Sequence, residues 1–73
     1  MYGERLRKAR KEKKLTLTEV ADLLHTTHAT ISRYENEKIN VDAETLAVLC
    51  RLYHVSADYI LGLPTDLPYP EEK

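Results

Sequence analysis

The feature of this sequence that most constrains its fold is a pair of short helical patterns separated by only three residues. The segment Thr16-Leu17-Thr18-Glu19 has the form of a capping box, in which a threonine and a glutamate three positions later close the first turn of a helix. Apolar residues then recur at helical spacing as far as Leu24. After His25-Thr26-Thr27 a second helix is expected, with Thr27 as its N-cap and an end near Glu35. A connection this short holds two helices against each other at a steep angle.

The two predicted helices carry the residue types that such close packing needs. A small residue has to face the partner helix, and Ala21 supplies it, while Ile31 supplies a β-branched wedge on the second helix. Val20, Leu24 and Tyr34 complete the apolar seam. The unit matches a helix-turn-helix, whose second helix enters the major groove of DNA.

The rest of the chain also divides into short helices. One is expected from Tyr2 to Lys13, a second after the N-cap Asp42, and a third from Ala57 to Leu61 after the N-cap Ser56 and before a left-handed stop at Gly62. The inward stripe of the helix after Asp42 consists of Leu46, Leu49, Cys50 and Tyr53. Residues 1–63 are therefore predicted to form one compact all-α bundle of five helices. Residues 64–73, with three prolines, are predicted to be an extended or disordered tail.

The composition argues against several classes of protein. No apolar run approaches the ~18 residues of a membrane span, and the charges from Glu4 onward are unlike a secretory signal. The single Cys50 excludes an internal disulfide, so the cytoplasm is the expected location. There is no glycine-rich phosphate loop and no nucleophile with a base at a defined spacing. We therefore expect neither enzyme activity nor a cofactor or small-molecule ligand.

A zinc site is the alternative that the histidines suggest. His25 and His28 are three residues apart, and Cys50 and His54 are four apart, which are spacings that zinc sites use. However, Cys50 lies on the predicted inward face of its helix, where a free cysteine usually acts as a small hydrophobe. No metal site is predicted.

The net charge of −1 argues weakly against nucleic acid as a partner, but the charge is unevenly distributed. Residues 1–40 hold nine basic and six acidic side chains, whereas residues 41–73 hold two basic and six acidic ones. Electrostatic attraction depends on where charge lies as well as on its sum. The basic first helix is compatible with a DNA-facing surface and equally with an ordinary solvated face.

Four segments in order give the chain a family resemblance. They are Gly3 to Arg7, Leu15 to Ala21, Ala29 to Glu35 and Val55 to Gly62. Together they resemble the Xre/Cro/C1-type repressors, and the resemblance covers residues 2 to 62. It implies a lambda-repressor-like five-helix DNA-binding domain and a transcriptional regulator, most simply a repressor.

Three positions depart from the pattern of that family. His25 and His54 stand where the family usually has glycine in turns, and histidine adopts a left-handed conformation at some cost in strain. Both are interpreted as turn residues. Leu17 stands where the family often has a glutamine that contacts a phosphate, so that side-chain contact is lost and only backbone N–H groups remain there.

The candidate base-reading residues lie on the outer face of the second helix of the motif. Arg33 is the strongest candidate because its guanidinium matches O6 and N7 of guanine, although an ion pair with Glu37 is an alternative role. His28 can bond a purine edge, Ala29 can touch a thymine methyl, and Ser32 shares this face. The candidate phosphate contacts are Thr16, Leu17, Thr18, Thr27, Asn36, Lys38 and Asn40.

The resemblance further implies a partly buried salt bridge between Arg10 and Glu35, which fixes the recognition helix against the first helix. Because one recognition helix covers few bases, we expect a homodimer on a pseudo-palindromic site. The candidate dimer residues are Val41, Val55, Ala57 and Tyr59. A protein-interaction module or antitoxin-type partner on the same scaffold remains the alternative function.

Overall fold

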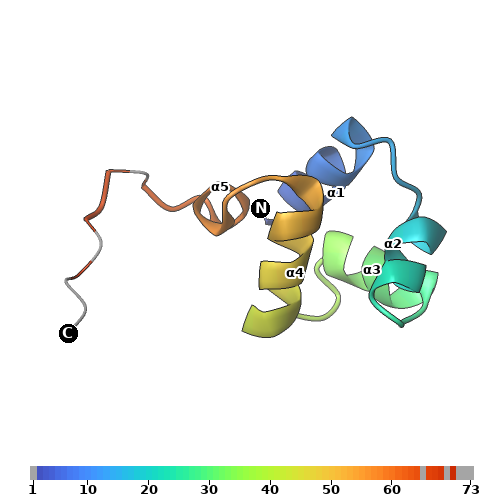
Figure 1. The fold of residues 1–73 in the computed structure, drawn as a ribbon. Coiled ribbons are helices and arrows are strands. Elements are labelled where there is room, and N and C mark those ends of the chain that lie inside the picture. Colours follow the sequence, from blue (N-terminus) through green and yellow to red (C-terminus); the bar gives the residue numbers. More distant parts are fainter. Residues whose placement is uncertain (1, 65, 69, 71–73) are drawn as a thin grey trace.

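A computed structural model describes residues 2–64, 66–68 and 70 of the chain, and in this part it contains five α-helices and no strand (Figure 1). The predicted all-α fold class is confirmed. The helices are α1 (Tyr2–Glu12), α2 (Leu17–Leu23), α3 (His28–Glu35), α4 (Ala43–Tyr53) and α5 (Ala57–Leu61).

The four predicted N-caps all close their helices. Thr16 accepts from the backbone N–H of Glu19, whose side chain accepts in return from the backbone of Thr16, so the capping box is complete. The side chains of the other three caps, Thr27, Asp42 and Ser56, each accept from the backbone N–H three residues later. These bonds satisfy N–H groups that have no partner within the helix, which is why the helices begin at these residues.

The turns contain several left-handed residues. His25 has a φ of 57°, His54 a φ of 59° and Gly62 a φ of 71°, as the turn assignments predict. Lys14 and Glu37 also have positive φ, at 59° and 57°, which the sequence did not signal. The connections around α2 and after α3 and α4 therefore each contain a residue in a conformation that favours glycine.

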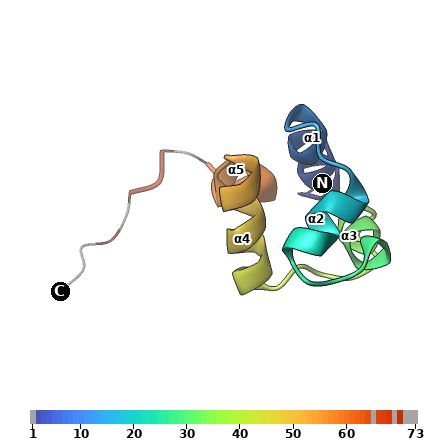
Figure 2. The same cartoon turned by 45° about the vertical axis from the view of Figure 1, so that its right-hand side comes forward.

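The core lies where α1 to α4 converge, and α5 closes it from one side (Figure 2). Ala21 and Ile31 are buried between α2 and α3, so the predicted small residue and wedge occupy the positions assigned to them. The largest fully buried side chains come from all five helices and are Leu6, Val20, Ile31, Leu49, Tyr53 and Ile60. Helix α3 packs against both α1 and α2, which fixes its orientation in the domain.

The first turn of α1 passes directly over the end of α3. A Cβ atom added to Gly3 would clash with the backbone carbonyl of Glu35. The Gly3 N–H also donates to the Glu37 carboxylate at 3.3 Å. Gly3 is thus required by the close approach of two backbones.

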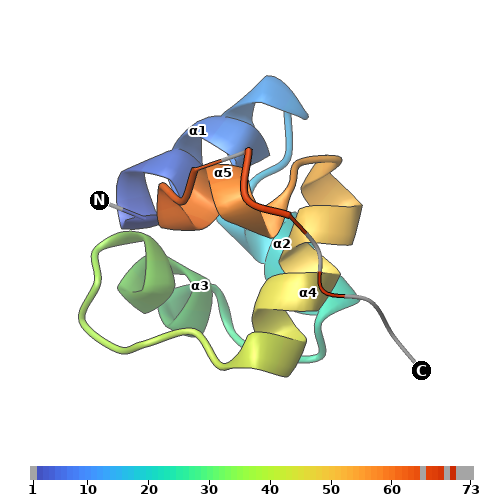
Figure 3. The same ribbon diagram turned by 90° about the vertical axis from the view of Figure 1, so that its left-hand side faces the viewer.

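Helix α1 also holds α5, and the two lie side by side (Figure 3). The Arg5 guanidinium donates to the Tyr59 carbonyl at 3.1 Å and lies 5.8 Å from the centre of the Tyr59 ring. Beyond Gly62 the described residues form no helix and lead away from the bundle. The predicted tail also includes residues 65, 69 and 71–73, which lie outside the described residues, so the division at residue 63 stays a prediction.

Candidate nucleic-acid interface

The two faces of α3 differ sharply in exposure. Ile31 and Glu35 are buried against the rest of the domain. On the other face His28 and Arg33 are exposed, and the predicted base-reading residues Ala29 and Ser32 are half-buried. The structure therefore places these four candidates on one helix whose inner side is anchored in the core.

Most of the predicted phosphate contacts lie on the protein surface around α3. Those that are exposed are Thr16, Thr18, Thr27, Asn36, Lys38 and Asn40. They occur at the start of α2, at the start of α3 and in the segment that follows α3. Leu17 differs, because its side chain is half-buried and packs against the core.

The inner side of α3 is anchored to α1 by a buried ion pair. Arg10 donates from Nε to Glu35 Oε2 at 2.7 Å and from Nη2 to Glu35 Oε1 at 3.0 Å. The hydrogen bond to Glu35 raises the pKa of Arg10 above its ordinary value. Arg10 also donates to the Leu15 carbonyl at 2.9 Å, just before α2. One guanidinium thus fixes the start of the motif and its second helix together.

A second arginine on α1 reaches the end of α3 and was missed by the sequence analysis. Arg7 lies 3.4 Å from Glu35 through Nε and donates from Nη2 to Asn36 Oδ1 at 2.6 Å. Asn36 Nδ2 in turn donates to Ser32 Oγ at 3.2 Å. The available signals were the three-residue spacing of Arg7 from Arg10 and the four-residue spacing of Ser32 from Asn36.

Arg33 is not held by the neighbour that the sequence suggested. Within the described part of the chain, Arg33 has no ion pair, and the Glu37 carboxylate accepts instead from Gly3. The guanidinium of Arg33 is therefore exposed and available for an external partner.

A helix-turn-helix family model matches residues 6–60, which span α2, α3 and α4 and parts of α1 and α5. The chain belongs to the Xre/Cro/C1-type helix-turn-helix family.

Several curated relatives carry regulator names. The chain is 44% identical over 71 residues to the uncharacterized HTH-type transcriptional regulator YobD of Bacillus subtilis, covering 97% of this chain and 62% of the relative. It is 40% identical over 60 residues to the HTH-type transcriptional regulator ImmR of the same organism, covering 82% of this chain and 47% of ImmR. The chain thus spans about half to three fifths of the length of these relatives.

The candidate dimer residues of this family member do not form one patch. Val41 precedes α4 and Val55 follows it, so the 11-residue helix separates them by about 16 Å. Both are half-buried and pack against the core. Ala57 and Tyr59 are exposed on α5 near Val55 in sequence, although the Tyr59 ring also contacts Arg5.

His25 and His54 lie in turns and Cys50 lies in the core, as the sequence predicted. Cys50 is buried on the inner side of α4, and burial raises the pKa of its thiol. His25 and His54 are exposed turn residues. The described residues contain no group of three or more potential metal ligands. None of the helices in this part of the chain is long and apolar enough to cross a membrane.

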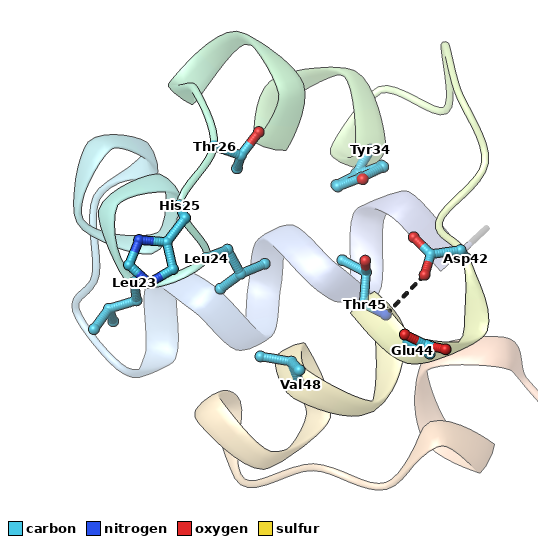
Figure 4. A pocket seen from close by; sticks show the side chains of 9 residues that line it. All are labelled: Leu23, Leu24, His25, Thr26, Tyr34, Asp42, Glu44, Thr45 and Val48. Atoms are coloured by element: carbon cyan, nitrogen blue, oxygen red, sulfur yellow. Dashed lines mark hydrogen bonds between the residues drawn. The ribbon is translucent and has the colours of Figure 1, made fainter.

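An open groove of about 490 Å³ lies between the α2–α3 turn and α4 (Figure 4). Leu24 and Val48 approach each other across it, while Leu23 and His25 lie at one end. The carboxylates of Asp42 and Glu44 lie at the other end. Leu23 is 58% exposed and Val48 is 42% exposed, so the groove has apolar surface on both of its sides.

Proposed function

We propose that the chain binds double-stranded DNA sequence-selectively and regulates transcription as a repressor, with α3 in the major groove. The observation that carries the proposal is the division of α3 into a buried face, anchored by Ile31 and Glu35, and an outer face with exposed His28 and Arg33. A helix held this rigidly can present side chains to base edges at fixed positions. The regulator names of YobD and ImmR support the regulatory part of the proposal.

Each candidate side chain has a role that follows from its chemistry. Arg33 bonds O6 and N7 of a guanine, His28 bonds a purine edge, and Ala29 contacts a thymine methyl. Ser32 bonds a base edge from the same helix. The surface residues around α3 contact phosphates and set the register of the protein on the duplex, with Leu17 contributing through its backbone. This second group is Thr16, Leu17, Thr18, Thr27, Asn36, Lys38 and Asn40.

The arrangement of charge supports DNA binding in spite of the net charge of −1. The predominantly basic residues 1–40 include α1, α2 and α3, while the predominantly acidic remainder includes α4 and α5. Figure 2 shows α4 and α5 on one side of the domain and α1 to α3 on the other. The acidic part can therefore lie away from the phosphates while the basic part approaches them.

The same proposal includes a homodimer on DNA, acting in the cytoplasm. A two-fold symmetric pair would read half-sites about 10 base pairs apart. Val55, Ala57 and Tyr59 are the candidate contacts, with Val41 at the opposite end of α4. Selection of bound sequences from a random duplex pool tests the dimer, because a selected site without inverted symmetry contradicts it.

The decisive experiment compares Arg33→Ala with Arg51→Ala, an exposed arginine on α4 that serves as the matched loss of charge. Arg33→Ala should weaken binding to the selected site by about 1–3 kcal/mol and leave binding to random duplex nearly unchanged. Arg51→Ala should preserve both. If Arg33→Ala weakens both kinds of binding equally, Arg33 contacts phosphate and the base-reading role is wrong.

A second candidate function is a protein-interaction module or antitoxin-type partner. The observation that favours it is the groove beside α4, where Leu23 and Val48 expose apolar surface. Titration with random duplex separates the two functions, because a DNA binder loses affinity with a log–log slope of about −0.9 per phosphate contact as salt rises. Absence of duplex binding at about 50 mM salt would favour the interaction module.

A further inference from the structure

A chain of hydrogen bonds connects α1 to the outer face of α3. It begins at Arg7 Nη2, which donates to Asn36 Oδ1 at 2.6 Å, and continues from Asn36 Nδ2 to Ser32 Oγ at 3.2 Å. Ser32 and Asn36 are four residues apart, and His28 is four residues before Ser32, so the three lie along one stripe of α3 and its C-cap. The chain therefore ends among the candidate base-reading residues.

The direction of every bond in this chain is fixed by chemistry. A guanidinium has only donors, so the Asn36 atom that faces Arg7 must be the carbonyl oxygen. The Asn36 amide nitrogen then faces Ser32, and because that nitrogen has only donors, the Ser32 oxygen must accept. The hydroxyl proton of Ser32 consequently points away from Asn36, and no other partner for it occurs among the described residues.

This ordering changes what α3 shows to a ligand. A free serine hydroxyl donates or accepts equally well, so it carries little preference between bases. In this protein Asn36 occupies one of the two lone pairs of the Ser32 oxygen and leaves the hydroxyl proton unbonded, so Ser32 is biased toward donating. The second amide hydrogen of Asn36 is a further donor beside it. A donor at Ser32 favours acceptors on base edges, namely purine N7, guanine O6 and thymine O4, over the amino groups of cytosine and adenine.

We propose that Arg7 is a positioning residue that sets this donor pattern and thereby contributes to base preference without contacting a base. The inference rests on the proposed DNA binding. Arg7 is itself held in place, because its Nε lies 3.4 Å from a Glu35 carboxylate that Arg10 fixes from the other side. Without Arg7, the Asn36 amide can rotate by half a turn, so that its carbonyl oxygen faces Ser32. The Ser32 hydroxyl then donates to Asn36 and offers its oxygen to DNA as an acceptor.

The test measures the ratio of affinities for two duplexes that differ at one base pair, since this ratio cancels any uniform loss of electrostatic attraction. The base pair is the one whose preference is lost in Ser32→Ala. Arg7→Met should reduce the preference at that same pair by about 2- to 10-fold, the ordinary worth of one neutral hydrogen bond. Lys8→Met removes an equal charge from the exposed side of α1 and should leave the preference intact.

Asn36→Asp provides a sharper variant that does not depend on losing a side chain from α1. Aspartate keeps an acceptor for Arg7 but cannot donate to Ser32, so the Ser32 hydroxyl donates to the new carboxylate and no longer to DNA. The preference at the base pair read by Ser32 should therefore fall as in Arg7→Met. This variant also serves if Arg7→Met fails to fold, as judged by circular dichroism.

The outcomes separate this inference from the function on which it rests. If the wild-type chain binds no duplex at about 50 mM salt, both the proposed function and this inference fail. If it binds selectively and Arg7→Met and Asn36→Asp keep the full preference, the positioning role of Arg7 is wrong and the DNA-binding proposal stands. A Ser32→Ala variant with no loss of preference at any position also overturns the inference.

Discussion

Replacement of Arg10 by methionine should destabilise the domain more than any surface substitution, because it leaves a buried carboxylate without its main partner. The Glu35 side chain is only 3% exposed and receives two hydrogen bonds from Arg10. After the change, the nearest remaining cation is Arg7, whose Nε lies 3.4 Å from Glu35. The bond from Arg10 to the Leu15 carbonyl is lost as well.

The size of the effect follows from these contacts. Breaking a buried ion pair by removing one partner costs about 3–5 kcal/mol. A chain of 73 residues has a total stability on the order of 4–11 kcal/mol. Arg10→Met should therefore remove a large part of the stability and lower the Tm by roughly 12–40 °C, at about 4–8 °C per kcal/mol for a domain of this size.

The assay is urea unfolding followed by circular dichroism, with the double variant Arg10→Met/Glu35→Leu as the critical comparison. The double variant leaves no unpaired buried charge, so it should be more stable than Arg10→Met alone and close to the wild-type chain. Lys11→Met on the exposed side of α1 is the matched control and should change stability by no more than about 0.5 kcal/mol.

Two results would refute this reasoning. One is a loss below about 1 kcal/mol in Arg10→Met, which is the range of an exposed ion pair and would mean that Glu35 is well solvated or fully compensated by Arg7. The other is a double variant no more stable than Arg10→Met, which would show that the lost stability comes from packing and from the Leu15 bond and not from the stranded charge.

Three further changes test other parts of the fold by the same unfolding measurement. Gly3→Ala should destabilise the domain by about 1–3 kcal/mol because the added methyl group meets the Glu35 backbone. Helix propensity alone predicts a gain in stability, and such a gain would contradict the close approach of Gly3 to Glu35. His54→Gly should stabilise by about 0.5–1 kcal/mol, since it relieves a left-handed residue, whereas His54→Ala should give no gain. Hydrogen bonds from the hydroxyl and backbone N–H of Thr45 lower the pKa of Asp42 in the folded chain. The Asp42 carboxylate therefore stabilises the fold above the pKa that it has in the unfolded chain. This stabilisation is lost as the pH falls through the lower pKa of the folded chain. The difference between wild type and Asp42→Ala should therefore shrink below about pH 4, and a constant difference would contradict the cap.

The features that the sequence predicted well are those whose partners are close along the chain. Each N-cap bonds a backbone N–H only three residues away, so a threonine, serine or aspartate before an apolar repeat is sufficient evidence. The burial of Ala21 and Ile31 follows equally from a short turn and two helical periods. The left-handed turns at His25 and His54 were predictable only through the family pattern, since histidine itself does not require that conformation.

The features that the sequence did not predict depend on how α1 docks against the rest of the domain. Arg7 and Asn36 are 29 residues apart, Gly3 and Glu37 are 34 apart, and Arg5 and Tyr59 are 54 apart. Nothing in local spacing indicates which of several arginines on one basic helix reaches which partner. In the sequence, Arg7 therefore cannot be distinguished from its exposed neighbour Lys8, and only the position of α3 shows that Arg7 has partners there.

Glu35 connects the stability of the domain to the surface proposed to read DNA. It is the last residue of α3, it anchors that helix through Arg10, and it also holds the guanidinium that orders Asn36. In the proposed complex the basic residues 1–40 attract phosphates whatever the base sequence, so base preference has to come from the geometry of individual donors on α3. A change at Glu35 should consequently alter stability and base preference together, whereas changes at Arg33 or Ser32 alter base preference alone.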